Sequence, residues 1–499
     1  MGDKTSERLK TGIFWNFIGK FSGKFLSFAT NIVLARILVP EDFGKVAVAM
    51  VVWEVITIFG EMGLSAKLIH QQDELHQHAT AAFWMNILIA LVIGLASLAI
   101  SPVAVRFYDQ PMIKSIIAVL ALGNMITAFG ATHSTLLIKK MAFKQLSLLI
   151  ISLSIIRSAI SIILVTNGFG IWSLVLPQLL TAPLRVTAVW IMEPWRPEMR
   201  LYSEYWKSLF HFGKFVFGTT IIHYININGD YMVIGKILGA SALGLYQHAY
   251  TIANWPISNL VWVSGRLLFP AFSRLQNNLA EFRSLYLRAI ETMSILAFPV
   301  LTGLILVAGD LIPLVYGEKW RPSVVPLKLI LLFAFVRTVG SIGGKVLMAV
   351  GKPQKEFRFN AAQVIPLVIA ILVGSKFGIT GVAAGMSLVL ASFGVVFVRV
   401  ASSAIGLTMG SVGRAIWPAS SCSFLMWLVL TVLGLILTKT AIHQTVGLFL
   451  TIGCGMLLYP TFLFLLFRDR TMKLIRLATD ILSLHFSFLA LRRKTQFSR

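Results

Sequence analysis

The feature that most constrains the fold of this chain is a series of apolar runs, each about 20 residues long, that recurs from one end to the other. A helix of about 20 residues crosses the roughly 30 Å hydrocarbon core of a bilayer, at a rise of about 1.5 Å per residue. Only 13% of the residues are charged and 57% are hydrophobic, whereas soluble domains carry about 25% charged residues. The sequence therefore predicts an all-α polytopic membrane protein without a large soluble domain.

The apolar runs predict about fourteen transmembrane helices. They cover about residues 11–38, 44–64, 81–103, 113–136, 146–166, 171–192, 214–238, 242–265, 289–309, 324–350, 359–375, 381–404, 415–438 and 445–467. Within the run over 324–350, several small residues follow one another after Arg337, and small residues permit close helix contact or bending.

The net charge of +24 comes mainly from lysine and arginine in the even-numbered connections and at both termini. Those connections hold Lys67, Lys139, Lys140, Lys144, Arg196, Arg200, Lys207, Arg266, Arg274, Arg283, Arg288, Lys352, Lys355, Arg358 and Arg414. Under the positive-inside rule, this asymmetry predicts that both termini lie in the cytoplasm. Nucleic-acid binding is excluded because no stretch combines a basic face with an independent fold.

Two segments at an offset of 200 residues resemble each other without gaps. Leu34–Leu38 followed by Phe43-Gly44 aligns with Ile234–Leu238 followed by Leu243-Gly244. We interpret the match as a duplication that makes the first two spans equivalent to the seventh and eighth, in a two-halved transporter plan. The predicted division is a six-helix lobe over 1–200, a second over 201–405, two extra helices over 406–467 and a basic cytoplasmic tail over 468–499. The tail is either an amphipathic helix on the membrane surface or a solvated segment.

The clearest polar pattern inside an apolar run lies in the first span, where five residues recur at steps of three or four and share one helix face. These residues are Asn16, Lys20, Lys24, Ser27 and Asn31. A charge near the bilayer centre costs roughly 2.5–3.5 kcal/mol on insertion scales, so this face needs a watery cavity or a polar partner. We interpret it as an anion-binding wall. The alternative is a structural role in which Glu54 and Glu61 neutralise the lysines.

The seventh span carries a second polar face, formed by His223, Asn226 and Asp230. Asp230 either pairs with a cation of the first half or carries a coupling ion, H⁺ or Na⁺. A fixed buried ion pair is the structural alternative. Together with Asn16, Asn31 and Glu54, these residues are the candidate polar and coupling groups.

Two further cations, Arg157 and Arg337, lie well inside the fifth and tenth spans, so cations outnumber anions within the membrane. Phosphate oxygens are the natural partners of such arginines and lysines. Lys20, Lys24, Arg157 and Arg337 are therefore the candidate ligands of a substrate phosphate or diphosphate.

The sequence has no motif for ATP hydrolysis, for zinc proteolysis or for a serine nucleophile, and no Cys/His cluster with metal-ligand spacing. No external connection exceeds about 15 residues, too few to hold a catalytic domain at the outer surface. We therefore expect neither an enzyme nor a metal site, and no cofactor other than a coupling ion.

Several strings resemble those of Wzx-type polysaccharide flippases, the polysaccharide transport branch of the MOP superfamily. They are LARILVPEDFG at 34–44, GEMGL at 60–64, LIHQ at 68–71, YININ at 224–228 with ILG at 237–239, RLLFPAF at 266–272 and PLVYGEKW at 313–320. The resemblance extends over about residues 10–405. It implies a MATE-like, two-lobed bundle that moves undecaprenyl-diphosphate-linked oligosaccharides across the bacterial inner membrane.

This resemblance predicts a role in exopolysaccharide, capsule or O-antigen biosynthesis. The expected partners are the lipid-linked oligosaccharide, membrane lipid and, in the same assembly line, a polymerase, a copolymerase and glycosyltransferases. The alternative is a MATE-type multidrug antiporter, which predicts a substrate site dominated by acidic and aromatic groups.

Overall fold

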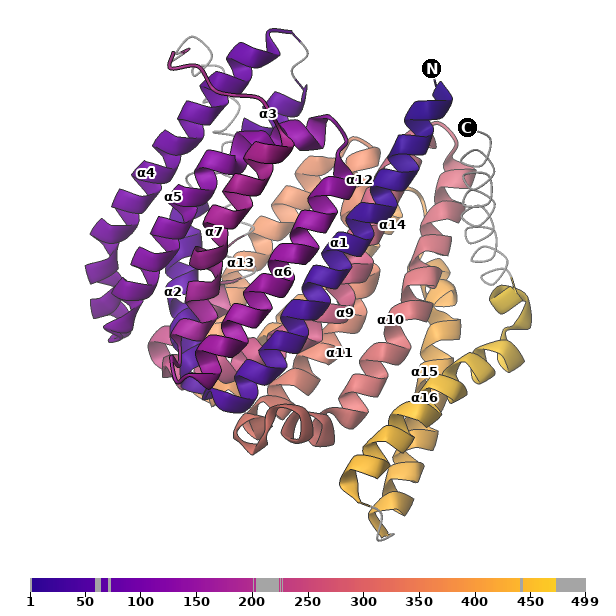
Figure 1. Ribbon diagram of the computed structural model, residues 1–499. Helices are drawn as coiled ribbons and strands as arrows, with labels where there is room; N and C mark the ends of the chain where they lie inside the picture. The colour runs from indigo at the N-terminus through magenta and orange to yellow at the C-terminus, as the bar shows by residue number, and fades with distance from the viewer. Residues whose placement is uncertain are drawn as a thin grey trace, which may run out of the picture. The chain divides into compact units, whose positions relative to one another are not determined.

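The computed structural model describes residues 2–58, 64–70, 73–200, 202, 224, 226, 228–439 and 443–472, and its regular elements in these ranges are helices (Figure 1). The first half of the chain contains α1 (Gly2–Ile37), α2 (Pro40–Ile58), α3 (Leu64–His70), α4 (Leu75–Tyr108), α5 (Met112–Lys139), α6 (Phe143–Thr166) and α7 (Trp172–Met192). After residue 228 come α9 (Gly239–Arg274), α10 (Leu279–Tyr316), η1 (Glu318–Ser323), α11 (Val324–Gly340), α12 (Gly343–Ala349), α13 (Pro353–Ser375), α14 (Gly378–Ala404), α15 (Met409–Lys439) and α16 (Gln444–Leu466).

Ten helical stretches in the described part of the chain are long and apolar enough to cross a membrane. The predicted all-α membrane fold is confirmed, and the predicted number of about fourteen spans is not established by this count. The predicted spans fall on helices, with 324–350 divided between α11 and α12. Most of 214–238 and the end of 44–64 lie outside the described residues. The predicted tail lies outside them beyond Met472, and the division into lobes stays a prediction.

One predicted span, 324–350, is interrupted rather than continuous, because α11 ends at Gly340 and α12 begins at Gly343. Because glycine has a poor helix propensity, ending a helix at these residues costs little free energy. A Cβ atom on Gly343 would lie 3.0 Å from the Phe397 ring and 3.1 Å from Ala401. The small residues therefore both bend this span and let it approach α14 closely.

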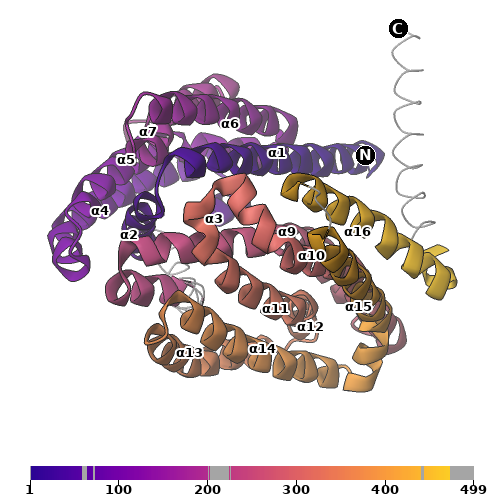
Figure 2. The same cartoon turned by 90° about the horizontal axis from the view of Figure 1, so that it is seen from below.

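The chain divides into two compact units. The first contains residues 1–248, 315–323 and 360–386, and the second contains 249–314, 324–359 and 387–499. In the first unit α1 packs along α6, α6 along α7, α7 along α5 and α5 along α4 (Figures 1 and 2). Glycines make the α1–α6 seam possible, since a Cβ atom on Gly19 would lie 2.7 Å from that of Ser147.

The turn between α1 and α2 follows directly from its sequence. Pro40 opens α2, where its missing N–H is not needed and its restricted φ suits a helix. Two residues on, the Asp42 carboxylate accepts a hydrogen bond of 3.3 Å from the backbone N–H of Val39. The acidic first turn, Glu41 and Asp42, also complements the positive end of the helix dipole.

The start of α2 and the start of α9 make a reciprocal backbone contact in the first unit. A Cβ atom on Gly44 would overlap the backbone carbonyl of Ala240, and one on Gly244 would overlap that of Pro40. At the offset of 200, Gly44 is equivalent to Gly244 and Pro40 is equivalent to Ala240. The two contacts are therefore the same contact with the two segments exchanged. This is the contact that a twofold relation between the two segments would produce, in agreement with the predicted duplication.

The end of α1 exchanges hydrogen bonds with the end of α10 and with η1, which follows it. The Nε atom of Arg36 donates to the Val315 carbonyl at 2.7 Å, while Lys319 Nζ donates to the Arg36 carbonyl at 2.8 Å. Trp320, which is fully buried, donates from its indole N–H to the Ala35 carbonyl at 2.9 Å. The last carbonyls of a helix lack partners within it and carry its negative dipole end, so basic side chains satisfy both needs.

In the second unit, α16 is attached to α10 by polar contacts along its length. The Tyr459 hydroxyl donates to the Ile295 carbonyl at 2.9 Å. The amide of Gln444, the first residue of α16, donates to Asp310 at 2.8 Å, and Arg470, just beyond the end of the helix, pairs with Glu291 at 2.7 Å. With α15 packed against it, α16 therefore forms a helical pair that is fixed to α10.

Candidate functional site

The polar face of α1 is exposed, and the face beside it forms the seam with α6. Lys20, Lys24, Ser27 and Asn31 are all exposed, whereas Gly19 is buried against Ser147. Successive residues in a helix differ by about 100° around its axis, so Lys20 and Lys24 lie about 100° around α1 from the seam glycines Gly19 and Gly23 that precede them. The backbone of Asn16 continues the same face, and its side chain lies outside the described residues.

On the other helix of the seam, Arg157 is exposed and inclines toward α7. Its Nη2 atom donates to the Thr181 hydroxyl at 3.4 Å. Thr181 is itself buried and donates to the Pro177 carbonyl at 2.8 Å. Lys20, Lys24 and Arg157 thus lie on two helices that pack directly against each other.

Arg337, the fourth predicted phosphate ligand, lies in the second unit. It is half-buried on α11, one turn before the interruption at Ser341, and its guanidinium has no hydrogen-bond or ion-pair partner among the described residues. Its grouping with Lys20, Lys24 and Arg157 stays a prediction.

Two polar residues that neighbour the predicted groups of the second half contact α2. The Asn228 amide donates to Glu54 at 3.3 Å, and the Tyr224 hydroxyl donates to the Val51 carbonyl at 2.8 Å. Glu54 therefore has an amide as its partner in the described structure, and not one of the α1 lysines proposed in the structural alternative. Glu61 and His223 lie outside the described residues.

Asp230 is fully buried and forms no ion pair among the described residues. Its Oδ1 atom accepts from the Tyr231 backbone N–H at 2.9 Å, and its Oδ2 atom has no hydrogen-bond partner. One turn earlier, the Asn226 amide donates to the Asn360 carbonyl at 3.2 Å. No cation pairs with Asp230 among the described residues, and its predicted pairing with a cation of the first half stays a prediction.

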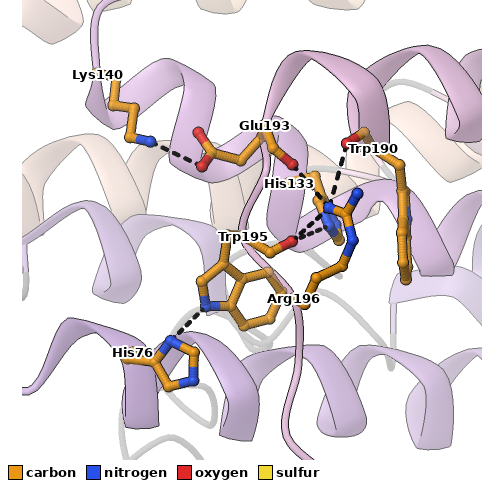
Figure 3. A network of polar contacts seen from close by, with 7 residues as sticks. All are labelled: His76, His133, Lys140, Trp190, Glu193, Trp195 and Arg196. Carbon is orange, nitrogen blue, oxygen red and sulfur yellow. Dashed lines mark hydrogen bonds and ion pairs between the residues drawn. The ribbon is translucent and has the colours of Figure 1, made fainter.

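A second polar cluster attaches the connection after α7, residues 193–196, to α4 and α5 (Figure 3). His133 is buried and stacks on Trp190 with ring centroids 4.5 Å apart, and its ring nitrogen lies 3.1 Å from the Trp195 carbonyl. Lys140 pairs with the buried Glu193 at 2.7 Å. The Arg196 guanidinium donates to three backbone carbonyls, including that of Trp195. These contacts hold the connection in place. Sequence analysis missed those of His133 and Lys140 because they join residues far apart in the chain.

Just beyond this cluster, Glu198 accepts a hydrogen bond of 2.6 Å from the Tyr202 hydroxyl and pairs with His76 at 3.0 Å. The Tyr202 hydroxyl, and then the nearby His76 and Arg200, hold the pKa of Glu198 below its ordinary value.

Sequence analysis also missed Arg185 and Thr181. Arg185 lies seven residues before the end of its predicted span over 171–192, and a long basic side chain at such a place can extend toward the interface. The sequence does show that Arg185 follows Thr181 by four residues, a spacing that predicts both side chains on one face of a helix.

Comparison with known proteins agrees with these observations. A family model described as "Polysaccharide biosynthesis protein" matches residues 33–325. The Lipopolysaccharide biosynthesis protein WzxC of Escherichia coli is 27% identical over 390 residues, which cover 77% of this chain and 78% of the relative.

Two solved structures show the same fold. The Lipid II flippase MurJ, in an inward closed conformation, has a TM-score of 0.73 at 17% identity and covers 92% of this chain and 99% of its own. An inward-facing multidrug resistance MATE family transporter of the MOP superfamily has a TM-score of 0.58 at 15% identity and covers 77% and 94%.

The predicted resemblance to Wzx-type flippases is confirmed by the sequence matches, and the MATE-like architecture by the structural ones. Because the family model matches more than half of its length, this chain belongs to the polysaccharide biosynthesis protein family.

Proposed function

We propose that this protein is a flippase that moves undecaprenyl-diphosphate-linked oligosaccharide units across the bacterial inner membrane by alternating access. The observation that supports this proposal most directly is that Lys20 and Lys24 are exposed on α1, which packs against α6, the helix that contains Arg157. Similarity to WzxC supports a role in exopolysaccharide, capsule or O-antigen biosynthesis. Transport, and not catalysis, is the proposed activity.

In this proposal, Lys20, Lys24 and Arg157 hold the diphosphate, and Arg337 joins them from the second half of the chain. Exposed cations within a membrane span lower the cost of moving a multiply charged group through hydrocarbon, because ammonium and guanidinium groups replace its hydration. The lipid chain stays in the bilayer while the oligosaccharide passes along polar residues such as Asn31. Both termini lie in the cytoplasm, where the polymer-assembly enzymes supply the substrate.

We further propose that Asp230 carries the coupling ion, H⁺ or Na⁺. A buried carboxylate without a counter-charge is costly, and binding of a proton or a cation removes that cost. The unpartnered Oδ2 atom supports this assignment.

The first test is the double substitution Lys20→Ala/Lys24→Ala. We expect loss of surface polysaccharide export, at least tenfold, with unchanged protein level in the membrane. The matched control is Lys114→Ala/Lys376→Ala, which removes the same charge from residues outside the proposed site and should leave export unchanged. Normal export by the Lys20/Lys24 variant would refute the site.

The competing function is multidrug antiport, which the structural likeness to a MATE transporter favours. It calls for acidic and aromatic groups facing an organic cation, whereas the exposed polar face of α1 is cationic. Increased drug sensitivity on gene deletion, with surface polysaccharide intact, would decide for that function.

A further inference from the structure

Two arginines of neighbouring helices lie close together inside the first unit, at α6 and α7. Arg157 donates to the Thr181 hydroxyl at 3.4 Å, and Arg185 follows Thr181 by one helical turn on the same face of α7. Both arginines are exposed, and neither has a carboxylate partner among the described residues.

The depth of Arg157 in the membrane bears on the kind of anion that this pair would bind. Arg157 lies about 21 Å from the first residue of α6 and about 14 Å from its last, at about 1.5 Å per residue. It is therefore near the middle of the span, where a single charge costs roughly 2.5–3.5 kcal/mol on insertion scales. An anion between two cations that repel each other there would stabilise both.

The surroundings of the pair are apolar and exposed. Four aliphatic residues of α6 and α7 next to the arginines are exposed, among them Ile155 at 52% and Leu180 at 50%. The other two are Ile156 and Leu184. An anion that suits this surface carries an aliphatic chain, so its ligand is an anionic lipid.

Depth also distinguishes between two kinds of anionic lipid. The headgroup phosphates of bilayer phospholipids lie beyond the hydrocarbon edge, about 15 Å from the midplane. A phosphate near the midplane belongs instead to a lipid that is crossing the membrane. Two guanidinium groups, each able to bind bidentately, match the two phosphates of a diphosphate.

We propose that Arg157 and Arg185 form a binding site for the diphosphate of a polyprenyl lipid at mid-membrane, with its chain against the aliphatic residues of α6 and α7. Thr181 is a positioning residue, because its hydroxyl accepts from Arg157 and fixes the direction of the guanidinium. This inference rests on the proposed function and adds Arg185 and Thr181 to it.

The test is binding of undecaprenyl diphosphate to the full-length protein in nanodiscs, compared with binding of phosphatidylglycerol. We expect Arg185→Ala and Arg157→Ala each to raise the Kd for the diphosphate by about tenfold to a hundredfold. Arg157→Lys and Arg185→Lys should also weaken binding, because lysine keeps the charge and loses the bidentate geometry. If an alanine variant fails to fold, the Kd values of these two lysine variants decide the test.

Thr181→Val should weaken diphosphate binding less than either arginine substitution, and should have no further effect in Arg157→Ala protein. A merely structural role of Thr181 would lower stability equally in both backgrounds. The matched controls are Arg106→Lys, an exposed arginine near the end of α4, and Thr166→Val at the end of α6, both expected to bind normally.

Unchanged diphosphate binding by the Arg157 and Arg185 variants would overturn the inference while leaving the proposed function intact. An equal loss of phosphatidylglycerol binding would also overturn it, because the site would then belong to a bilayer phospholipid. Failure of the unaltered protein to bind undecaprenyl diphosphate would instead refute the proposed function.

Discussion

At the scale of single residues, Glu198 provides a pH-dependent contact that can be tested by removing one hydroxyl group. Its pKa is depressed first by the Tyr202 hydroxyl, so the contact stabilises the fold above the ordinary carboxyl pKa of 4.5 and loses this effect as the pH falls through the lower folded value. We expect Tyr202→Phe to lower the thermal unfolding midpoint at pH 7. The difference from the unaltered protein should shrink as the pH falls below 4.5 and disappear once Glu198 is protonated in the folded protein.

The control for this prediction is Glu198→Gln, in which Tyr202→Phe should have a much smaller effect. Unfolding in detergent, followed by tryptophan fluorescence between pH 3 and pH 8, measures all four proteins. A Tyr202→Phe effect that persists unchanged at low pH, or in the Glu198→Gln background, would contradict the assigned cause.

At the scale of helices, the reciprocal contact between α2 and α9 depends on glycine. A Cβ atom on Gly44 meets the Ala240 backbone, which cannot rotate away as a side chain can. We expect Gly44→Ala to lower stability by about 1–3 kcal/mol through overpacking. Gly413→Ala in α15 is the matched control, because nothing lies within 4 Å of its added Cβ atom and alanine favours a helix by about 0.5–1 kcal/mol. Equal thermal unfolding midpoints for the two variants would contradict this account of the contact.

At the scale of the whole molecule, the buried carboxylate of Asp230 predicts how transport is coupled to an ion gradient. Asp230→Asn keeps the size of the side chain and removes its charge, so the protein should fold and still bind its lipid substrate. We expect export to fall at least tenfold and to lose its dependence on the proton or sodium gradient. Measuring uptake of a lipid-linked oligosaccharide into vesicles, with each gradient imposed separately, identifies the ion. A variant that keeps gradient-driven transport would exclude Asp230 as the coupling group.

The positions of the spans were predictable because the requirement for them is local. About 20 apolar residues in a row have to cross the bilayer wherever they lie in the fold, and α6 and α7 begin and end within a few residues of the predicted limits. The face that carries Lys20 and Lys24 was predictable for the same reason, since helical spacing alone puts these residues on one side of α1. The glycines around Ser341 indicate either an interrupted helix or a continuous helix in close contact with a neighbour. The sequence alone therefore could not decide that the span is interrupted there.

What a face of a helix contacts depends on how that helix is rotated against others, and side-chain packing between distant segments sets this rotation. The sequence by itself determined a multi-pass helical membrane protein, a cationic row on α1 and the family resemblance. The tertiary structure decided that Arg157 turns toward Thr181 and that Glu54 meets Asn228 instead of a lysine. It also decided that Asp230 is buried with no counter-charge among the residues that the structure describes. Each of these contacts joins residues of different helices, so periodicity along a single helix could not reveal it.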